Sequence, residues 1–171
     1  LFALNDEVET LKDAFQSARN APTLEVLVPL AWHFRQRDSR FALSIAYQAE
    51  ALINEQHMPA VQADYFRARL HLIRGEERWL QGDFGQAEVL AENALALYST
   101  HGDQMGIGDS LWLLSFIANA QEKTDAFDQL LIQANSAYAN TGDEVRTALV
   151  TLRRIFNKIF FDVPAAQIWL D

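Results

Sequence analysis

The stretch of sequence that decides the fold is Trp79–Tyr98, which reads WLQGDFGQAEVLAENALALY. Its pattern predicts the end of one helix, a tight turn and a second helix. Asp83 can cap the second helix and, with Gln86 three residues later, forms a pair that resembles a capping box. Gly82 suits the left-handed position that closes the first helix. The apolar and small residues of the second helix share one face: Ala87, Leu90, Ala91, Ala94, Leu97 and Tyr98.

The same face recurs at two other places in the chain. Forty residues later stand Phe127, Leu130, Leu131, Ala134, Ala137 and Tyr138. Forty-five residues earlier stand Ala42, Ile45, Ala46, Ala49, Leu52 and Ile53. The turns repeat as well, because Gly102-Asp103 and Gly142-Asp143 also lie forty residues apart. A fixed period of this length predicts an array of helical repeats.

The composition narrows the class of protein. With 171 residues, 50% of them hydrophobic, the chain is long enough for one folded domain. It has no cysteine, which excludes disulfides and thiolate metal sites, and we expect a cytoplasmic protein. A net charge of −9 disfavours non-specific binding to nucleic acid or to anionic membranes. No apolar run is long enough to span a membrane, and the first residues lack the basic start of a signal peptide. Because the sequence does not begin with Met, we expect a segment of a longer protein.

The pattern predicts an all-α fold of seven or eight helices in antiparallel pairs. The expected ranges are 5–19, 23–37, 39–55, 60–81, 83–100, 104–121, 125–140 and 143–161. Pro29 either kinks the second of these helices or moves its start to near Val28. The helix at 60–81 carries two apolar stripes, which predicts neighbours on two of its sides.

Several of these residues together resemble the tetratricopeptide repeat (TPR) family. They are small residues where two helices cross closely, and the Gly-Asp-aromatic turn between them: Gly75, Gly82-Asp83-Phe84, Ala87 and Ala94. The resemblance implies one domain, 1–171, built as a superhelix. It would contain a capping helix (1–20), repeat units at 23–56, 68–101 and 108–141, and a partial fourth unit at 143–161. Arg37 and Glu122 stand where the first and third units should carry the turn glycine.

A second similarity concerns the run Ala31–Asp38 (AWHFRQRD) and the residues through Leu52. This run is similar to regions that precede diguanylate cyclase (GGDEF) domains in bacterial signalling proteins. It implies that the chain is a regulatory or sensing region, although no catalytic motif of such a cyclase is present. We therefore expect a module that binds a protein or a peptide. A small-ligand-sensing domain of a transcription regulator is the alternative, followed by an enzyme on a helical scaffold.

The TPR resemblance places the partner in a concave groove lined by the first helix of each unit. The matching positions are Leu27, Phe34, Arg35, Arg69, Leu72, Glu76, Trp79, Trp112, Phe116, Asn119, Leu152, Phe156, Ile159 and Phe160. We hypothesise that Trp79 and Trp112 anchor the partner, because aromatic residues near an arginine dominate many interfaces. The alternative is that these rings only fill the space between units.

Other candidate sites have less support in the sequence. The four histidines, His33, His57, His71 and His101, form no metal-ligand pattern, and we expect no metal and no cofactor. The glycines at 102, 106 and 108 follow no strand, so we expect a helix end and a helix start there instead of a phosphate loop. Arginines at 67, 69, 74 and 78 could bind an acidic partner or pair with acidic residues nearby in this chain. We expect the pairing within the chain.

Overall fold

The structure is a computed structural model that describes residues 5–18 and 21–161. These residues form eight helices and no strand. The helices are α1 Asn5–Ser17, α2 Leu24–Phe34, α3 Ser39–Glu55, α4 Ala60–Leu80, α5 Phe84–His101, α6 Gln104–Ala120, α7 Thr124–Ala139 and α8 Glu144–Phe161. The all-α prediction is confirmed, and each predicted helix has a counterpart whose ends differ by three residues or fewer. None of the described helices is both long and apolar enough to cross a bilayer.

Capping residues and turn residues explain where the helices begin and end. Asp83 Oδ1 accepts a hydrogen bond from the backbone N–H of Gln86, 3.2 Å away, and so caps α5. Gly82 before it has a φ of +80°, a left-handed conformation that glycine adopts without strain. Glu122 occupies the corresponding turn before α7 with a φ of +60°. The third unit therefore keeps the geometry of the turn although it lacks the glycine, at some cost in strain.

Helix α2 differs from its prediction at both ends. It begins at Leu24 and contains Pro29, so the start near Val28 is wrong. It ends at Phe34, because the turn over Arg35–Arg37 and the cap at Asp38 come before α3. Asp38 accepts a hydrogen bond from the backbone N–H of Phe41. This cap fixes where the second helix of the first pair starts.

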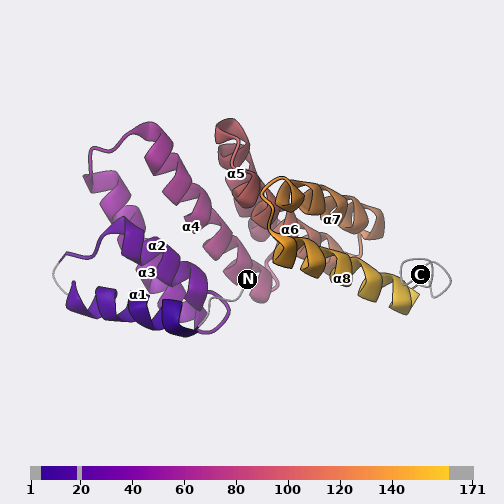
Figure 1. The fold of residues 1–171 in the computed structure, drawn as a ribbon, viewed down its shortest axis with the longest axis horizontal. Coiled ribbons are helices and arrows are strands. Elements are labelled where there is room, and N and C mark those ends of the chain that lie inside the picture. The colour runs from indigo at the N-terminus through magenta and orange to yellow at the C-terminus, as the bar shows by residue number, and fades with distance from the viewer. Residues whose placement is uncertain (1–4, 19–20, 162–171) are drawn as a thin grey trace.

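Each helix packs against the next one along the chain, with the largest contacts between α4 and α5 and between α6 and α7. Helices two apart also meet, because α2 contacts α4 and α4 contacts α6. Figure 1 shows the helices following one another along the long axis, from indigo α1 to yellow α8. The described helices thus form a layered array, and the superhelical twist stays a prediction.

The core is divided among the layers. Three apolar clusters span α1–α4, α4–α6 and α6–α8, and each draws on several neighbouring helices. Helix α4 contributes Leu70 and Ile73 to the first cluster and Ala68 and Leu72 to the second. The prediction of two buried sides for this helix is therefore confirmed. Val61 and Leu80 at its ends are exposed, so the two stripes are buried only along the middle of the helix.

Candidate functional site

A cavity lies among α2, α4 and α6, and we name it the tryptophan cavity after three of its residues. It is lined by Trp32, Arg35, Gln36, Leu72, Glu76, Trp79, Asp109, Trp112, Leu113, Phe116 and Tyr138. The cavity offers about 80 Å³ of room, within about 570 Å³ of empty space that includes its opening to solvent. Since one water needs roughly 10–15 Å³ by the first measure, the cavity could hold several waters or one inserted side chain.

One wall of the tryptophan cavity is aromatic. Trp79 of α4 and Phe116 of α6 meet edge to face with their ring centroids 5.4 Å apart, and Phe116 meets Trp112 in the same way at 5.0 Å. Edge-to-face contacts of this kind stabilise ring clusters beyond their buried area. The indole Nε1 of Trp79 is buried and has no hydrogen-bond partner. A buried donor of this kind gains free energy when an acceptor reaches it.

Another part of the lining is charged and joins the end of α2 to α4. Arg35 Nε donates to Glu76 Oε2 at 2.6 Å, and its Nη1 donates to the backbone oxygen of Trp32 at 2.6 Å. The guanidinium carbon lies 3.6 Å from the centroid of the Trp32 ring, a cation–π contact. Gln36 also donates to Glu76. Arg35 and Glu76 are only 7% and 8% exposed, so each neutralises a charge that would otherwise be buried alone.

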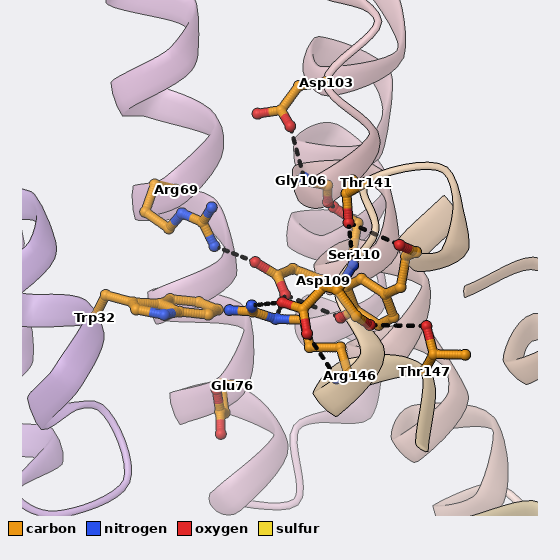
Figure 2. A network of polar contacts seen from close by, with 12 residues as sticks. Trp32, Arg69, Glu76, Asp103, Gly106, Asp109, Ser110, Thr141, Arg146 and Thr147 are labelled. Carbon is orange, nitrogen blue, oxygen red and sulfur yellow. Dashed lines mark hydrogen bonds and ion pairs between the residues drawn. The ribbon is translucent and has the colours of Figure 1, made fainter. Parts of the chain in front are cut away.

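Asp109 on α6 collects contacts from three other helices (Figure 2). Its Oδ2 accepts a hydrogen bond from Arg69 Nη1 of α4 at 2.5 Å, and its Oδ1 accepts one from the Tyr138 hydroxyl of α7 at 2.9 Å. Arg146 Nε of α8 lies 3.5 Å from the same Oδ1, an ion pair whose geometry does not make a hydrogen bond. One carboxylate therefore links α6 to α4, α7 and α8.

Two glycines of α6 make room for the tyrosines that flank it. A Cβ at Gly108 would lie 2.4 Å from the ring of Tyr138, and a Cβ at Gly106 would lie 2.3 Å from the ring of Tyr98. Burial raises the pKa of both tyrosines, and Asp109 raises that of Tyr138 further. Tyr138 is therefore protonated and donates to the carboxylate. The sequence placed these glycines at a helix start but gave no reason for them.

A second pocket lies beside the first and shares Trp32 with it; we name it the arginine pocket. Its lining is Val28, Pro29, Trp32, Tyr65, Phe66, Arg69 and Arg146. It offers about 190 Å³ of room. The guanidinium carbon of Arg69 lies 4.3 Å from the Trp32 ring centroid, so the indole contacts two arginines, Arg35 and Arg69.

The structure brings together six of the residues proposed for the groove. They all line the tryptophan cavity: Arg35, Leu72, Glu76, Trp79, Trp112 and Phe116. Arg69 lines the adjacent arginine pocket instead. Trp79 and Trp112 also pack against the second and third apolar clusters. These two rings therefore fill space between units and line the cavity at the same time.

The other proposed groove residues lie elsewhere. Phe34 packs edge to face with Phe41 of α3 at 4.9 Å, inside the first apolar cluster, because it points to the opposite side of α2 from the cavity. Leu27 is fully buried in that cluster. Exposed positions outside both pockets account for four more, namely Asn119, Leu152, Phe156 and Ile159. The side chain of Phe160 lies outside the described residues.

Sequence reasoning missed several residues that build the site, above all Trp32, Asp109 and Arg146. One usable signal was present, because Asp109 follows Arg69 by 40 residues, which is the spacing between the second and third predicted units. Opposite charges separated by one repeat period are expected to fall on successive first helices. Arg35 and Glu76 are 41 residues apart, whereas the first and second predicted units are 45 apart, so the same search would have missed this pair.

The remaining charged groups follow the expected pattern of local pairing. The expectation that the four arginines of α4 pair with acids is confirmed: Arg67 and Arg74 pair with Glu50, Arg69 with Asp109 and Arg78 with Glu77. Burial lowers the pKa of His33 and of His71. In the described part of the chain, no group of His, Asp and Glu side chains is arranged to hold a metal ion.

No protein-family model, no curated protein and no solved structure matches this chain, so the description of the site depends on its geometry alone.

Proposed function

We propose that the chain is a TPR-like module that binds a protein or peptide partner at the tryptophan cavity. The observation that carries the proposal is the aromatic wall of Trp79, Phe116 and Trp112, which stands beside the unpaired indole N–H of Trp79. Half-buried aromatic rings around a cavity are the usual anchors of protein interfaces. Most of the lining comes from α2, α4 and α6, which are first helices under the repeat resemblance, and the rest comes from Tyr138 of α7 and from the turn after α2.

The size of the cavity favours a side chain over a metabolite. Pockets for small molecules typically hold about 300–1,000 Å³, whereas the room here is about 80 Å³. An apolar side chain of a peptide would fit between the rings. The rest of the partner would then lie along the first helices.

We further propose that binding is relayed through the stacking of helix pairs, as suits the regulatory region of a bacterial signalling protein. Arg35–Glu76 joins α2 to α4, and Arg69–Asp109 joins α4 to α6. Glu76 and Asp109 both line the cavity. A partner that contacts these carboxylates would therefore act on two junctions of the array at once.

The test begins with peptides selected for binding from a random display library. We expect Trp79→Ala and Trp112→Ala each to weaken the selected peptides at least roughly tenfold, as loss of an interface anchor does. The control is Tyr47→Ala, which removes an exposed ring of α3 away from the cavity. Thermal melting is measured on the same variants. A loss of about 3 kcal/mol of stability per site, with unchanged affinity, would make both rings core residues. A metabolite screen that raises the melting temperature more than any peptide would favour a small-ligand sensor.

A further inference from the structure

Helix α8 carries a row of apolar side chains that no other described helix covers. Val145, Leu152, Phe156 and Ile159 are between 39% and 68% accessible. Their intervals of seven, four and three residues place them on one face of the helix, and we name them the α8 stripe. A row of exposed apolar residues on one face marks a site of interaction, whereas single exposed apolar residues need no explanation.

An open groove borders the α8 stripe on one side, between α8 and the end of α7. Its lining is mostly small or apolar and includes Ala139 of α7 and Ala148, Leu152 and Ile155 of α8. The groove follows α8 from Glu144 to Ile155, which is about three turns of helix. It offers about 640 Å³ of room, compared with about 80 Å³ in the tryptophan cavity. This length and room suit a helix laid along α8, as when amphipathic helices bind apolar grooves.

Arg153 borders the α8 stripe on its other side and has no acidic partner. Its guanidinium carbon lies 5.0 Å from the ring centroid of Phe116 on α6 and 5.7 Å from that of Phe127 on α7. In the described part of the chain, ion pairs engage Arg146 and Arg154 of this helix but leave Arg153 without a carboxylate. Its Nε is buried and makes no hydrogen bond. The two rings therefore hold a half-buried cation that no described carboxylate neutralises.

The acidic residue of α8 does not offset this charge. Glu144 precedes Arg153 by nine residues, and nine steps of about 100° amount to two and a half turns. The two side chains therefore leave the helix on opposite sides, with Glu144 at the groove.

We propose that the α8 stripe and its groove bind an amphipathic helix of a partner protein, one with an apolar face and a carboxylate on the flank that meets Arg153. Apolar side chains of that helix cover Leu152 and Phe156 and enter the groove. Its carboxylate pairs with the Arg153 guanidinium, which the Phe116 ring keeps beside the stripe. The surface lies outside the tryptophan cavity, and the inference does not depend on the function proposed for that cavity.

A second copy of this chain is a poorer occupant. In an isologous contact the α8 stripe of one copy faces the α8 stripe of the other. When the two helices run antiparallel, the Arg153 flanks of both copies lie on the same side, and like charges across an interface are unfavourable. A partner that brings a carboxylate to this place avoids the repulsion and neutralises the charge.

The test uses two synthetic helical peptides of 18 residues, the length of α8, added to the full chain. Both have one face of leucines, and the positions that flank this face are glutamate in one peptide and glutamine in the other. We expect the glutamate peptide to bind roughly threefold or more tightly, as a partly exposed ion pair allows, in a fluorescence anisotropy titration at low salt. The chain's net charge of −9 works against this result, so a preference for glutamate must arise locally.

Variants then assign the two parts of the surface. Arg153→Gln should abolish the preference for glutamate and Arg153→Lys should keep it, whereas the control Arg40→Gln, which removes an exposed arginine of α3, should change nothing. Phe156→Ser should weaken both peptides at least roughly tenfold. Its control is Tyr47→Ser, which removes an exposed ring of α3. Thermal melting of the same variants checks that each one is folded.

Three results would overturn the proposal. The first is the absence of binding by either peptide, and the second is equal binding of both by the unmodified protein. The third is a dimer in sedimentation experiments that Phe156→Ser converts to a monomer, because the α8 stripe would then be covered by a second copy.

Discussion

Helices α6 and α8 correspond to the first helices of two successive predicted repeat units, but they differ in how well they are covered. Helix α6 contacts α4, α5 and α7, and most of its residues are buried, including the polar Asp109, Ser110 and Ser115. Helix α8 has its main contact with α7, and it exposes Leu152 and Phe156, which are 47% and 48% accessible. The difference indicates that burial in this array is supplied by neighbouring helices and not within one pair.

A layered array of this kind has a stability that is close to a sum of contacts between neighbours. Disruption at α6 should therefore affect several junctions, whereas disruption at α8 should affect one. Matched substitutions in the two regions can test this comparison directly.

The largest effect is expected at the carboxylate that joins four helices. Asp109→Asn would leave Arg69 and Arg146 facing a neutral side chain in a buried setting, and removing one partner of a buried pair typically costs about 3–5 kcal/mol. Asp128→Asn breaks the Arg154 pair between α7 and α8, where the carboxylate is 34% exposed, and should cost about 1 kcal/mol or less. Urea unfolding of both variants gives the two free energies.

Equal losses in these two variants would break the comparison. They would show that the end of the array is held as tightly as its middle, and that Asp109 has no special role in linking layers.

The next effect concerns packing instead of charge. Gly108→Ala places a methyl group where the ring of Tyr138 lies, and overpacking of a tight contact typically costs about 1–3 kcal/mol. Gly85→Ala is the control, because nothing lies within 4 Å of its added Cβ and alanine favours a helix by up to about 1 kcal/mol. Thermal melting should therefore move in opposite directions for the two variants. A neutral Gly108→Ala would mean that Tyr138 can turn away from α6 without loss.

The helices and turns could be predicted because their signals are local. Asp83 and Gly82 specify a cap and a turn through their own backbone chemistry, and the face that starts at Ala87 shows its period within a few turns of helix. The structure bears out these ranges. Glu122 shows the limit of this reasoning, because its side chain gives no signal for the left-handed conformation that it adopts between α6 and α7.

The site was harder to predict because it depends on which way each side chain points. Phe34 and Arg35 are neighbours in sequence but point to different sides of α2, so only Arg35 reaches the cavity. Phe156 stands one period after Phe116, yet it is exposed because the described chain places no further pair beside α8. A repeat position therefore acquires its environment only when both neighbouring layers are present.

The smallest expected effect is on the pH dependence of stability, which we expect to differ between the middle of the array and the start of α8. Burial lowers the pKa of His71 on α4, and nearby Arg74 lowers it further, so it lies below the ordinary value of 6.5. As the pH falls, His71 therefore binds a proton in the unfolded chain at a higher pH than in the folded chain. The free energy of unfolding consequently falls as the pH drops from about 7 to about 5. At the start of α8, hydrogen bonding from the backbone of Arg146 holds the pKa of Asp143 below 3.8. The stability that ionised Asp143 contributes is present above pH 3.8 and is lost only at lower pH.

Melting temperatures measured from pH 7 down to pH 3 should therefore fall in two separate steps. His71→Gln should reduce the upper step and leave the lower one, whereas Asp143→Asn should reduce only the lower one. The His33→Gln variant should act like His71→Gln, because burial also lowers the pKa of His33. If His71→Gln instead reduced the lower step, the two steps would not belong to separate groups. The contrast in coverage between α6 and α8 would then not extend to the pH dependence of their stability.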